Sequence, residues 1–481
     1  MAKAEEHTRY ATRRPGWWLT WGDWTLLGTI VLFASAVRLI SVTFPPWAVV
    51  DEFWYARDAC FYWLASIDRC GMANLIAPDR DVTTWLATYG ELTPEHPPLA
   101  KLLIGAPIAL LGYSAGVWRL ASVAAGVLTV IFVYLLARES SGSRTAAAGV
   151  SALVAIDFPH VIHSRLAMLE IFVALFAVAA FHFCLLDRRQ IAQRVEGRPS
   201  HRFWRVAAGI AGGAAVASKL SGAAIVAGVL VLILAWEVAA LRRARQPSSS
   251  YLWAAASIVL LLVIVPVATY MATYVGRLDG VLLSAPWSEG SWTGAWLERQ
   301  SYMLGFHADK PSTTPSPWAL PMTAEPLAYV LEQSRSGIRE ILLFGNPVLW
   351  WLGFAAVVYA AACWTRRKRT VPAGLVVVAF LASYAGWLSI TLTGRPVHLF
   401  YAVPVIPFIY LALALLVVDI ASTRAGRAMV ATALVGAAVA FVYYFPIITG
   451  QELAVVDWQP RACSALALWL EQMAACGLTG R

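Results

Sequence analysis

Long runs of apolar residues constrain the fold of this chain more than any other feature. Eleven runs could cross a lipid bilayer, although the third and fifth are short. They cover roughly residues 24–44, 117–138, 145–159, 166–186, 206–218, 220–238, 253–275, 346–364, 371–391, 397–419 and 427–447. Because 59% of the residues are hydrophobic and only 14% are charged, an ordinary soluble domain is excluded. The sequence predicts an all-α polytopic membrane protein with about eleven transmembrane helices.

The basic residues predict the orientation of these helices. With the N-terminus in the cytoplasm, the inside segments (residues 3–14, 138–144, 188–205, 242–245, 366–369 and 424–427) hold 21 Lys and Arg, whereas the short outside turns hold three. Residues 1–23 are polar and basic and lead into a full-length apolar run, so we expect no cleavable signal peptide. The net charge of +9 is thus explained by membrane topology, and nucleic-acid binding is not required.

This orientation divides the chain into parts. Residues 1–275 form an N-terminal transmembrane module, in which residues 45–116 are the first outer loop and residues 206–218 are glycine-rich for close helix packing. Residues 276–345 form a second outer loop, residues 346–447 a C-terminal module of four helices, and residues 448–481 an outer C-terminal tail. The protein is therefore expected in the cell membrane, with its C-terminus and its unusual polar residues on the outer face.

The first outer loop opens with two adjacent carboxylates, Asp51 and Glu52, at the point where the chain leaves the first apolar run. Apolar residues then recur at helical spacing from Phe53 to Ile67, while Arg57, Asp58 and Tyr62 fall largely off that stripe. The pattern predicts a helix lying in the membrane interface, with the two carboxylates at the level of the lipid head groups. A second interfacial or re-entrant helix is expected over residues 102–111, after Pro97 and Pro98.

Several more charged residues are predicted at the same outer boundary. The five cations there could together bind a phosphate, which requires several charge-assisted donors. They are, with the three preferred ones first, Arg119, Arg165, Lys101, Lys219 and Arg395. Three other polar residues lie beside them as further site candidates: His96, Asp157 and Glu170. A substrate with a phosphate head and an apolar tail fits this arrangement.

A metal site is a competing use of some of these residues. Asp157, His160 and His163 recur at three-residue spacing and with Glu170 could supply oxygen and nitrogen ligands. Because Pro159 disturbs the helix that would align them, we predict no metal ligands and no cofactor, and leave a divalent cation open as an alternative.

The cysteines test the topology. Cys60, Cys70, Cys463 and Cys476 fall on the outer, oxidising side, whereas Cys184 and Cys363 lie within apolar runs. Four outer cysteines allow three full pairings. We expect Cys60 to pair with Cys70 and Cys463 with Cys476, since each pairing closes a short loop at little entropic cost.

Several short segments resemble those of protein O-mannosyltransferases, in the same order. They are Asp51-Glu52, His96-Pro97-Pro98-Leu99-Ala100-Lys101, Trp118-Arg119-Leu120, the run from His163 to Glu170, the run from Ala217 to Gly222, the run from Tyr302 to His307, Gly345-Asn346-Pro347 with Trp350-Trp351, and the run from Phe400 to Pro404. The later segments resemble the actinobacterial branch. The large luminal insert of eukaryotic members is absent, and Glu325-Pro326 stands where members of this branch often have Arg-Pro.

The resemblance implies a GT-C type glycosyltransferase of eleven membrane helices. Its donor would be polyprenyl-phosphate mannose, its acceptor a Ser or Thr hydroxyl of a secreted polypeptide, and its catalytic base Asp51, while Glu52 would orient the hydroxyl or hold a cation. Independently of the family, transfer from a phosphate donor needs a base and cations for the departing phosphate. A single displacement would invert the anomeric centre.

Two other functions fit parts of the same pattern. A related transferase that moves the sugar to a lipid or glycan would need the same base and cations. A transporter is the non-enzymatic alternative, but transporters place ionisable residues near the membrane midplane and often contain repeats of interrupted helices. Here the charges lie at one face and no repeat is evident, so transport is the less favoured hypothesis.

Overall fold

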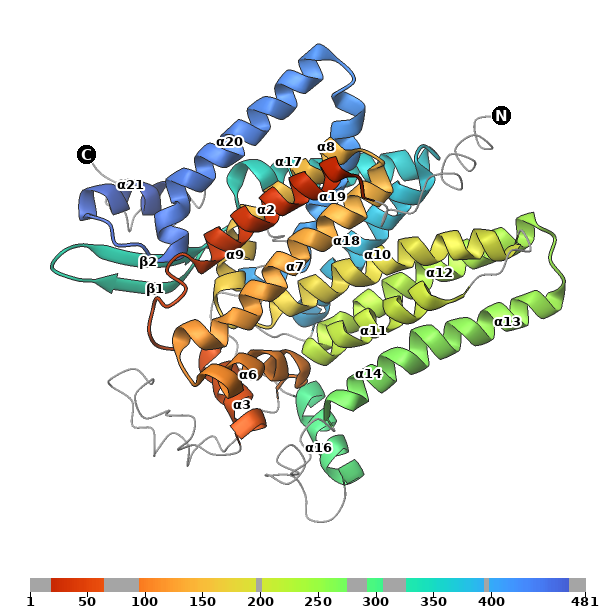
Figure 1. Ribbon diagram of the computed structural model, residues 1–481, viewed down its shortest axis with the longest axis horizontal. Coiled ribbons are helices and arrows are strands. Elements are labelled where there is room, and N and C mark those ends of the chain that lie inside the picture. The colour runs from red at the N-terminus through yellow and green to blue at the C-terminus, as the bar shows by residue number, and fades with distance from the viewer. Residues whose placement is uncertain are drawn as a thin grey trace.

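The computed structural model describes residues 19–64, 95–195, 201–274, 292–305, 326–392 and 398–466, and it is mostly helical (Figure 1). The elements of the N-terminal part are α2 (Trp21–Leu39), α3 (Glu52–Leu64), α6 (Leu99–Leu111), α7 (Ala115–Ser141), α8 (Arg144–Ala155), α9 (Phe158–Arg165), α10 (Glu170–Val195), α11 (Phe203–Ser218), η2 (Leu220–Gly222), α12 (Ala223–Arg243), α13 (Ser248–Val259), η3 (Leu260–Ile264) and α14 (Val265–Tyr274). They are followed by α16 (Trp292–Gly305), β1 (Leu327–Gln333), β2 (Ile338–Leu343), α17 (Pro347–Thr365), α18 (Thr370–Leu392), η4 (Leu399–Ala402), α19 (Ile406–Ile420), α20 (Arg424–Thr449) and α21 (Val455–Leu466).

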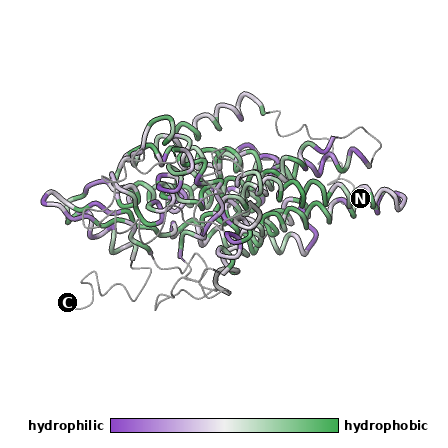
Figure 2. The backbone as a smooth tube through the Cα atoms, turned by 90° about the horizontal axis from the view of Figure 1, so that it is seen from below, coloured by the Kyte–Doolittle hydropathy of each residue, from purple (hydrophilic) through white to green (hydrophobic). Residues whose placement is uncertain are grey.

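Every predicted apolar run corresponds to helix in the structure, which confirms the helical membrane fold. In the described residues, eight helical segments are long and apolar enough to cross a membrane, or nine if α8 and α9 form one bent span. The runs predicted at 206–218 and 397–419 correspond to the shorter helices α11 and α19, of 16 and 15 residues. The predicted number of eleven spans therefore stays a prediction. Hydrophobic segments fill the middle of the molecule, and the more hydrophilic ones lie mostly toward its ends (Figure 2).

The third predicted span is broken by a bend of 59° between α8 and α9. The first helix ends at Ala155, and Asp157 caps the start of the second, since its Oδ1 accepts a hydrogen bond of 3.1 Å from the backbone N–H of His160. Its Oδ2 accepts from Trp350 Nε1 at 2.8 Å and from Tyr410 Oη at 2.6 Å. Trp350 lies in α17 and Tyr410 in α19, so Asp157 ties the bend before α9 to both of these helices.

The glycine-rich segment of α11 packs closely against its neighbour, as predicted. A Cβ atom on Gly209 would lie 2.1 Å from the carbonyl oxygen of Leu261, and one on Gly213 would lie 2.7 Å from that of Pro266. Larger side chains at these positions would force α11 away from η3 and α14.

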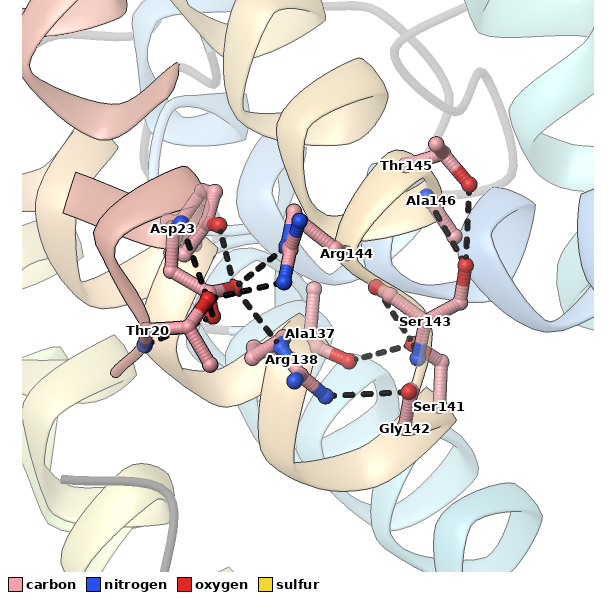
Figure 3. A network of polar contacts seen from close by, with 11 residues as sticks. Thr20, Asp23, Ala137, Arg138, Ser141, Gly142, Ser143, Arg144, Thr145 and Ala146 are labelled. Atoms are coloured by element: carbon pink, nitrogen blue, oxygen red, sulfur yellow. Dashed lines mark hydrogen bonds and ion pairs between the residues drawn. The ribbon is translucent and has the colours of Figure 1, made fainter. Parts of the chain in front are cut away.

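Ion pairs join the helix ends that the sequence places in the cytoplasm. Asp23 binds Arg138 Nε at 2.9 Å and Arg144 Nε at 3.5 Å, and Figure 3 shows its carboxylate between the two arginines. Arg205 binds both Asp187 at 2.8 Å and Glu237 at 2.6 Å. Arg138, Arg144 and Arg205 of the predicted basic segments therefore form ion pairs with carboxylates of α2, α10 and α12.

The opposite end of the molecule carries α3, α6 and a β-hairpin; in Figure 1 the hairpin projects at the left, and α3 and α6 lie at the lower left. β1 pairs antiparallel with β2, and an isolated bridge joins Ile338 of β2 to Leu453. The sequence analysis predicted no strands. The bridge shows that the second outer loop and the C-terminal tail, which were predicted as separate segments, pack on one another.

The helix predicted after the carboxylate pair is present as α3, but its predicted polar face is not exposed. Arg57, Asp58 and Tyr62, expected off the apolar stripe, are fully buried, whereas Trp63, expected on it, is 39% exposed. The physical reason is that α3 packs against α6, where Asp58 binds both Arg57 Nη2 at 2.8 Å and Lys101 Nζ at 2.7 Å. These ion pairs allow charged residues to lie inside the helix pair. The second helix, α6, begins after Pro98 as predicted.

The cysteines agree with the topology where the structure describes them. Cys184 and Cys363, which the sequence placed within apolar runs, are free and buried. Cys60 and Cys463 are disulfide-bonded. Cys70 and Cys476 lie outside the described residues, so the pairing of these four cysteines stays a prediction.

Candidate active site

Asp51 lies immediately before α3, at the end of the connection from α2. The preceding residue, Val50, has a φ of 50°, a conformation that costs a β-branched residue energy. The chain therefore makes a strained turn at the residue before Asp51. Such strain persists where the surrounding structure fixes the backbone, and the neighbouring Glu52 supplies that constraint.

Glu52 is fully buried and binds several elements at once. Arg119 of α7 donates to both of its carboxylate oxygens, from Nε at 2.8 Å and from Nη2 at 2.7 Å. Further donors are Trp118 Nε1 at 3.2 Å, the N–H of Ala167 at 2.7 Å and the N–H of Val49 at 3.1 Å. Because these bonds tie the start of α3 to α7 and to the α9–α10 connection, Glu52 holds the backbone that carries Asp51.

Asp51 itself is bound far less. Its Oδ2 accepts a hydrogen bond of 3.1 Å from Tyr55 Oη, one turn along α3. Burial and the charge of Glu170 raise the pKa of Asp51 to about 6, against the opposing effect of Lys219. Among the described residues Asp51 has no ion pair within 4 Å, so at neutral pH it is a carboxylate whose proton affinity is higher than usual.

Glu170 and Lys219 form an ion pair beside Asp51. Glu170 begins α10, and Lys219 follows α11 in an extended conformation that directs the chain into η2. The ammonium group binds Glu170 Oε1 and lies 4.2 Å from the centre of the Tyr401 ring. Lys219 is thus the described cation that is electrostatically coupled to Asp51.

His163 and Tyr329 complete the centre. His163 Nε2 lies 3.0 Å from the Oη of Tyr329, which comes from β1, and its Nδ1 lies 3.9 Å from Glu170 Oε2. Within the described part of the chain, His163 Nδ1 and Glu170 Oε2 are buried without a hydrogen-bond partner. Tyr329 is the extra residue at an irregularity of the β1–β2 register between Ala328 and Val330. A bulge of this kind redirects a side chain, here toward His163.

A pocket lies next to the Glu170–Lys219 pair. It is lined by Glu170, Val173, Lys219, Ser221, Ile225, Ser383, Gly386, Trp387, Tyr401 and Pro404. These residues come from α10, α12 and α18 and from the segments η2 and η4 with their flanking residues. The pocket therefore connects the charged centre with the apolar interior of the bundle.

The structure brings together only some of the residues predicted for the site. Lys101 is buried in the ion pair with Asp58. Beyond Glu52, Arg119 donates to the carbonyl oxygens of Val42, Pro45 and Trp47. Arg165 donates to the carbonyl oxygens of Ile40, Ile448 and Thr449. These contacts give the three cations structural partners and lend no support to their predicted role in binding phosphate.

The remaining predicted residues differ in position. The His96 ring lies 5.9 Å from that of Tyr55, whose hydroxyl binds Asp51, and Arg395 lies outside the described residues. Asp157 and His160 belong to the bend of α9, where His160 Nδ1 lies 2.8 Å from Arg38 Nη2. In the described ranges no three or more His, Cys, Asp and Glu side chains are grouped to hold a metal ion.

Sequence reasoning missed Tyr55, Tyr329 and Tyr401. Tyr55 lies four residues after Asp51, a spacing that places both on one face of a helix and could have been noticed. Tyr401 lies in a segment singled out only for its resemblance to a family. Tyr329 gave no signal, because its position depends on a β-bulge in a hairpin that was not predicted.

The architecture is that of solved membrane glycosyltransferases. One chain of the protein O-mannosyltransferase Pmt1-Pmt2 complex of S. cerevisiae, bound to the sugar donor, matches with a TM-score of 0.72 at 15% identity, over 95% of this chain and 93% of that one. ArnT from Cupriavidus metallidurans matches with a TM-score of 0.56 at 18% identity, over 94% of this chain and 71% of that one. The fold is therefore that of the GT-C glycosyltransferases, as expected.

Sequence comparison narrows this class to a family. The family model described as dolichyl-phosphate-mannose-protein mannosyltransferase matches residues 117–276. A polyprenol-phosphate-mannose–protein mannosyltransferase of Mycobacterium tuberculosis is 27% identical over 94% of this chain and 91% of its own length. Proteins of the same name from Mycolicibacterium smegmatis and Corynebacterium glutamicum are also 27% identical, over 78% and 82% of this chain and 81% of each relative. The chain is thus similar to protein O-mannosyltransferases over nearly its whole length, in agreement with the resemblance seen in its sequence.

Proposed function

We propose that this protein transfers mannose from polyprenyl-phosphate mannose to Ser or Thr hydroxyls of secreted polypeptides. The similarity to polyprenol-phosphate-mannose–protein mannosyltransferases over nearly the whole chain supports the donor and the polypeptide acceptor. The observation that carries the chemistry is the partly buried Asp51 carboxylate, which has a pKa of about 6 and lies near Lys219 without forming an ion pair with it. A base with a pKa just below the working pH both accepts a proton well and is mostly ionised.

In the proposed reaction the acceptor hydroxyl oxygen attacks the anomeric carbon of the donor. The bond between that carbon and the phosphate oxygen breaks, and the hydroxyl proton passes to Asp51. The leaving polyprenyl phosphate carries the electron pair of the broken bond, and the Lys219 ammonium stabilises its charge. One displacement gives a product of inverted configuration, without a covalent sugar–enzyme intermediate.

Glu170 and Tyr55 act as positioning residues in this scheme. The Tyr55 hydroxyl donates to Asp51 Oδ2 and holds the carboxylate in one rotamer. Glu170 fixes the Lys219 side chain by their ion pair. The carboxylate of Glu170 also raises the pKa of Asp51, so that the pair both holds the cation and tunes the base.

The reaction is proposed on the outer face of the cell membrane, with the N-terminus in the cytoplasm. The distribution of the basic loops supports this orientation, and the disulfide-bonded state of Cys60 and Cys463 at the site end of the molecule is consistent with an oxidising compartment.

The test is transfer by the purified full-length protein in lipid vesicles. We expect radiolabelled sugar to pass from polyprenyl-phosphate mannose to a Ser/Thr peptide, no transfer to the same peptide with Ala at those positions, and inverted configuration in the glycopeptide. Labelled lipid or glycan in place of labelled peptide would instead favour the related transferase with a lipid or glycan acceptor. Release of neither product from a protein that binds the donor would contradict both.

A further inference from the structure

Two residues of α18 line the pocket beside Lys219 with polar atoms that lack a partner. Ser383 is 6% exposed and Trp387 is 1% exposed. Among the residues that the structure describes, neither Ser383 Oγ nor Trp387 Nε1 has a hydrogen-bond partner. A buried polar group without a partner is costly, so two of them at one cavity indicate a ligand with polar groups.

Small residues hold α18 close to the segment after Lys219. A Cβ atom on Gly386 would lie 3.0 Å from the Cβ of Ser221, which also lines the pocket. Deeper in the bundle, a Cβ atom on Gly228 of α12 would lie 2.8 Å from the Cβ of Ala382. The two glycines therefore allow α18 to approach η2 and α12 closely, and Ser383 and Trp387 reach the same cavity as Lys219.

Apart from the Glu170 carboxylate, which is paired with Lys219, the polar side chains that line the pocket offer donors, and donors favour an anionic ligand. The indole N–H of Trp387 can only donate, the Ser383 hydroxyl can donate, and the Lys219 ammonium has two more N–H groups besides the one directed at Glu170. The start of α12 adds the positive end of a helix dipole at Ser221. Glu170 partly cancels the charge of Lys219, so Lys219 by itself attracts an anion only weakly. The neutral donors of Ser383 and Trp387 supply further hydrogen bonds to the anion.

The other lining residues indicate which anion enters. Val173, Ile225 and Pro404 make the rest of the wall largely apolar, which suits a hydrocarbon chain better than the hydroxyls of a sugar. A lipid monophosphate combines the two requirements, because its phosphate needs donors and its chain needs an apolar wall.

We propose that Ser383 and Trp387 donate hydrogen bonds to the phosphate of the polyprenyl phosphate that this pocket binds, with Lys219 as the cation. The identity of the lipid rests on the proposed function, whereas the assignment of the two donors rests on the pocket. The same oxygens are present before and after transfer, so the two residues bind the donor substrate and hold the departing product. They are specificity-determining residues for a lipid phosphate against the corresponding alcohol.

The test compares binding of polyprenyl phosphate and of polyprenol of the same chain length to the purified full-length protein, without acceptor. Trp387→Phe removes the N–H but keeps an aromatic ring, and Ser383→Ala removes the hydroxyl. Since a hydrogen bond to a charged group is worth a factor of about 10 or more in affinity, we expect each variant to lose about tenfold in affinity for polyprenyl phosphate and nothing for polyprenol.

Matched controls separate this effect from a general loss of packing. Ser122 of α7 is also buried without a described partner but does not line the pocket, and Trp364 lies at the opposite end of the pair α17–α18. Ser122→Ala and Trp364→Phe should leave both affinities unchanged. Equal losses for phosphate and alcohol in the pocket variants, or wild-type affinity for the phosphate in both, would overturn the assignment.

The outcome is separable from that of the proposed function. Selective loss of phosphate binding in a protein that transfers no sugar to peptides would support the two donors and contradict the proposed function. Peptide transfer with a wild-type donor KM in both pocket variants would support the function and overturn the role of Ser383 and Trp387.

Discussion

Helix α10 connects two buried carboxylate clusters that differ in how their charges are paired. Glu170 at its start lies with Asp51, and these two carboxylates have one described cation, Lys219. Asp187, seventeen residues along the helix and therefore about 25 Å away, lies with Glu237 among three arginines. The cluster with excess cations is a structural tie between helices. In the cluster with excess carboxylate, Lys219 pairs with Glu170 and Asp51 is left without an ion pair. The pKa of Asp51 is therefore raised, which suits this carboxylate to accept a proton.

The largest effect is expected from removing the carboxylate that lacks its own cation. Asp51→Asn keeps the shape of the side chain but cannot accept a proton, so the rate of transfer should fall by about 10² to 10⁴ fold while donor binding persists. Steady-state transfer and donor affinity measure the two quantities. Glu52→Gln is the comparison: it should mainly lower stability, by about 3–5 kcal/mol, because it breaks a buried ion pair with Arg119. An active Asp51→Asn beside a stable but inactive Glu52→Gln would move the base to Glu52.

The next effect concerns the single cation of the site. Lys219→Met should lower transfer by about 10² to 10³ fold, because the leaving phosphate loses a preorganised charge. The double variant Lys219→Met/Glu170→Gln controls for the carboxylate that the first change leaves buried and unpaired. If both variants keep wild-type turnover at saturating donor, Lys219 does not stabilise the leaving group.

A smaller effect is expected from pH. With the pKa of Asp51 at about 6, the deprotonated fraction falls below that value, so kcat/KM should be about tenfold lower at pH 5 than on its plateau above pH 7. The raised pKa also means that the folded state binds this proton more tightly than the unfolded chain, so ionisation of Asp51 lowers stability as the pH rises toward and through 6. Thermal unfolding at pH 7 should therefore show Asp51→Asn to be more stable than wild type. A flat activity profile between pH 5 and 7 would contradict the assignment of the base.

The smallest effect on transfer is expected at the other cluster. Arg205→Met removes the arginine shared by Asp187 and Glu237 and should cost about 3–5 kcal/mol of stability, because two buried carboxylates lose a partner. Turnover per folded molecule should stay within about twofold of wild type, measured against the amount of folded protein from size-exclusion chromatography. A large loss of turnover with unchanged folding would show that the two clusters are coupled. It would contradict the assignment of the Asp187–Glu237 cluster to a purely structural role.

Several features of this protein follow from the sequence by itself. The apolar runs determine where the helices lie, because a backbone in lipid must satisfy its own hydrogen bonds. The pair Asp51-Glu52 at the end of the first run pointed to the candidate site, and the ordered short segments pointed to the resemblance to protein O-mannosyltransferases. These features depend on composition and on neighbours close in the chain.

The tertiary structure decided which charged residues belong to the site. Sequence position placed Arg119, Arg165, Lys101 and Lys219 at one boundary. The first three bind structural partners, from Asp58 and Glu52 to the backbone at Ile448, whereas Lys219 pairs with Glu170 beside Asp51. Whether a cation is left for a ligand depends on which acceptors, up to 284 residues away in the chain, fold against it. The unpartnered Ser383 and Trp387 likewise carry no sequence signal, because a missing partner is a property of the packed structure. Periodicity and spacing describe only local geometry, whereas the pairing of buried charges is settled by long-range contacts.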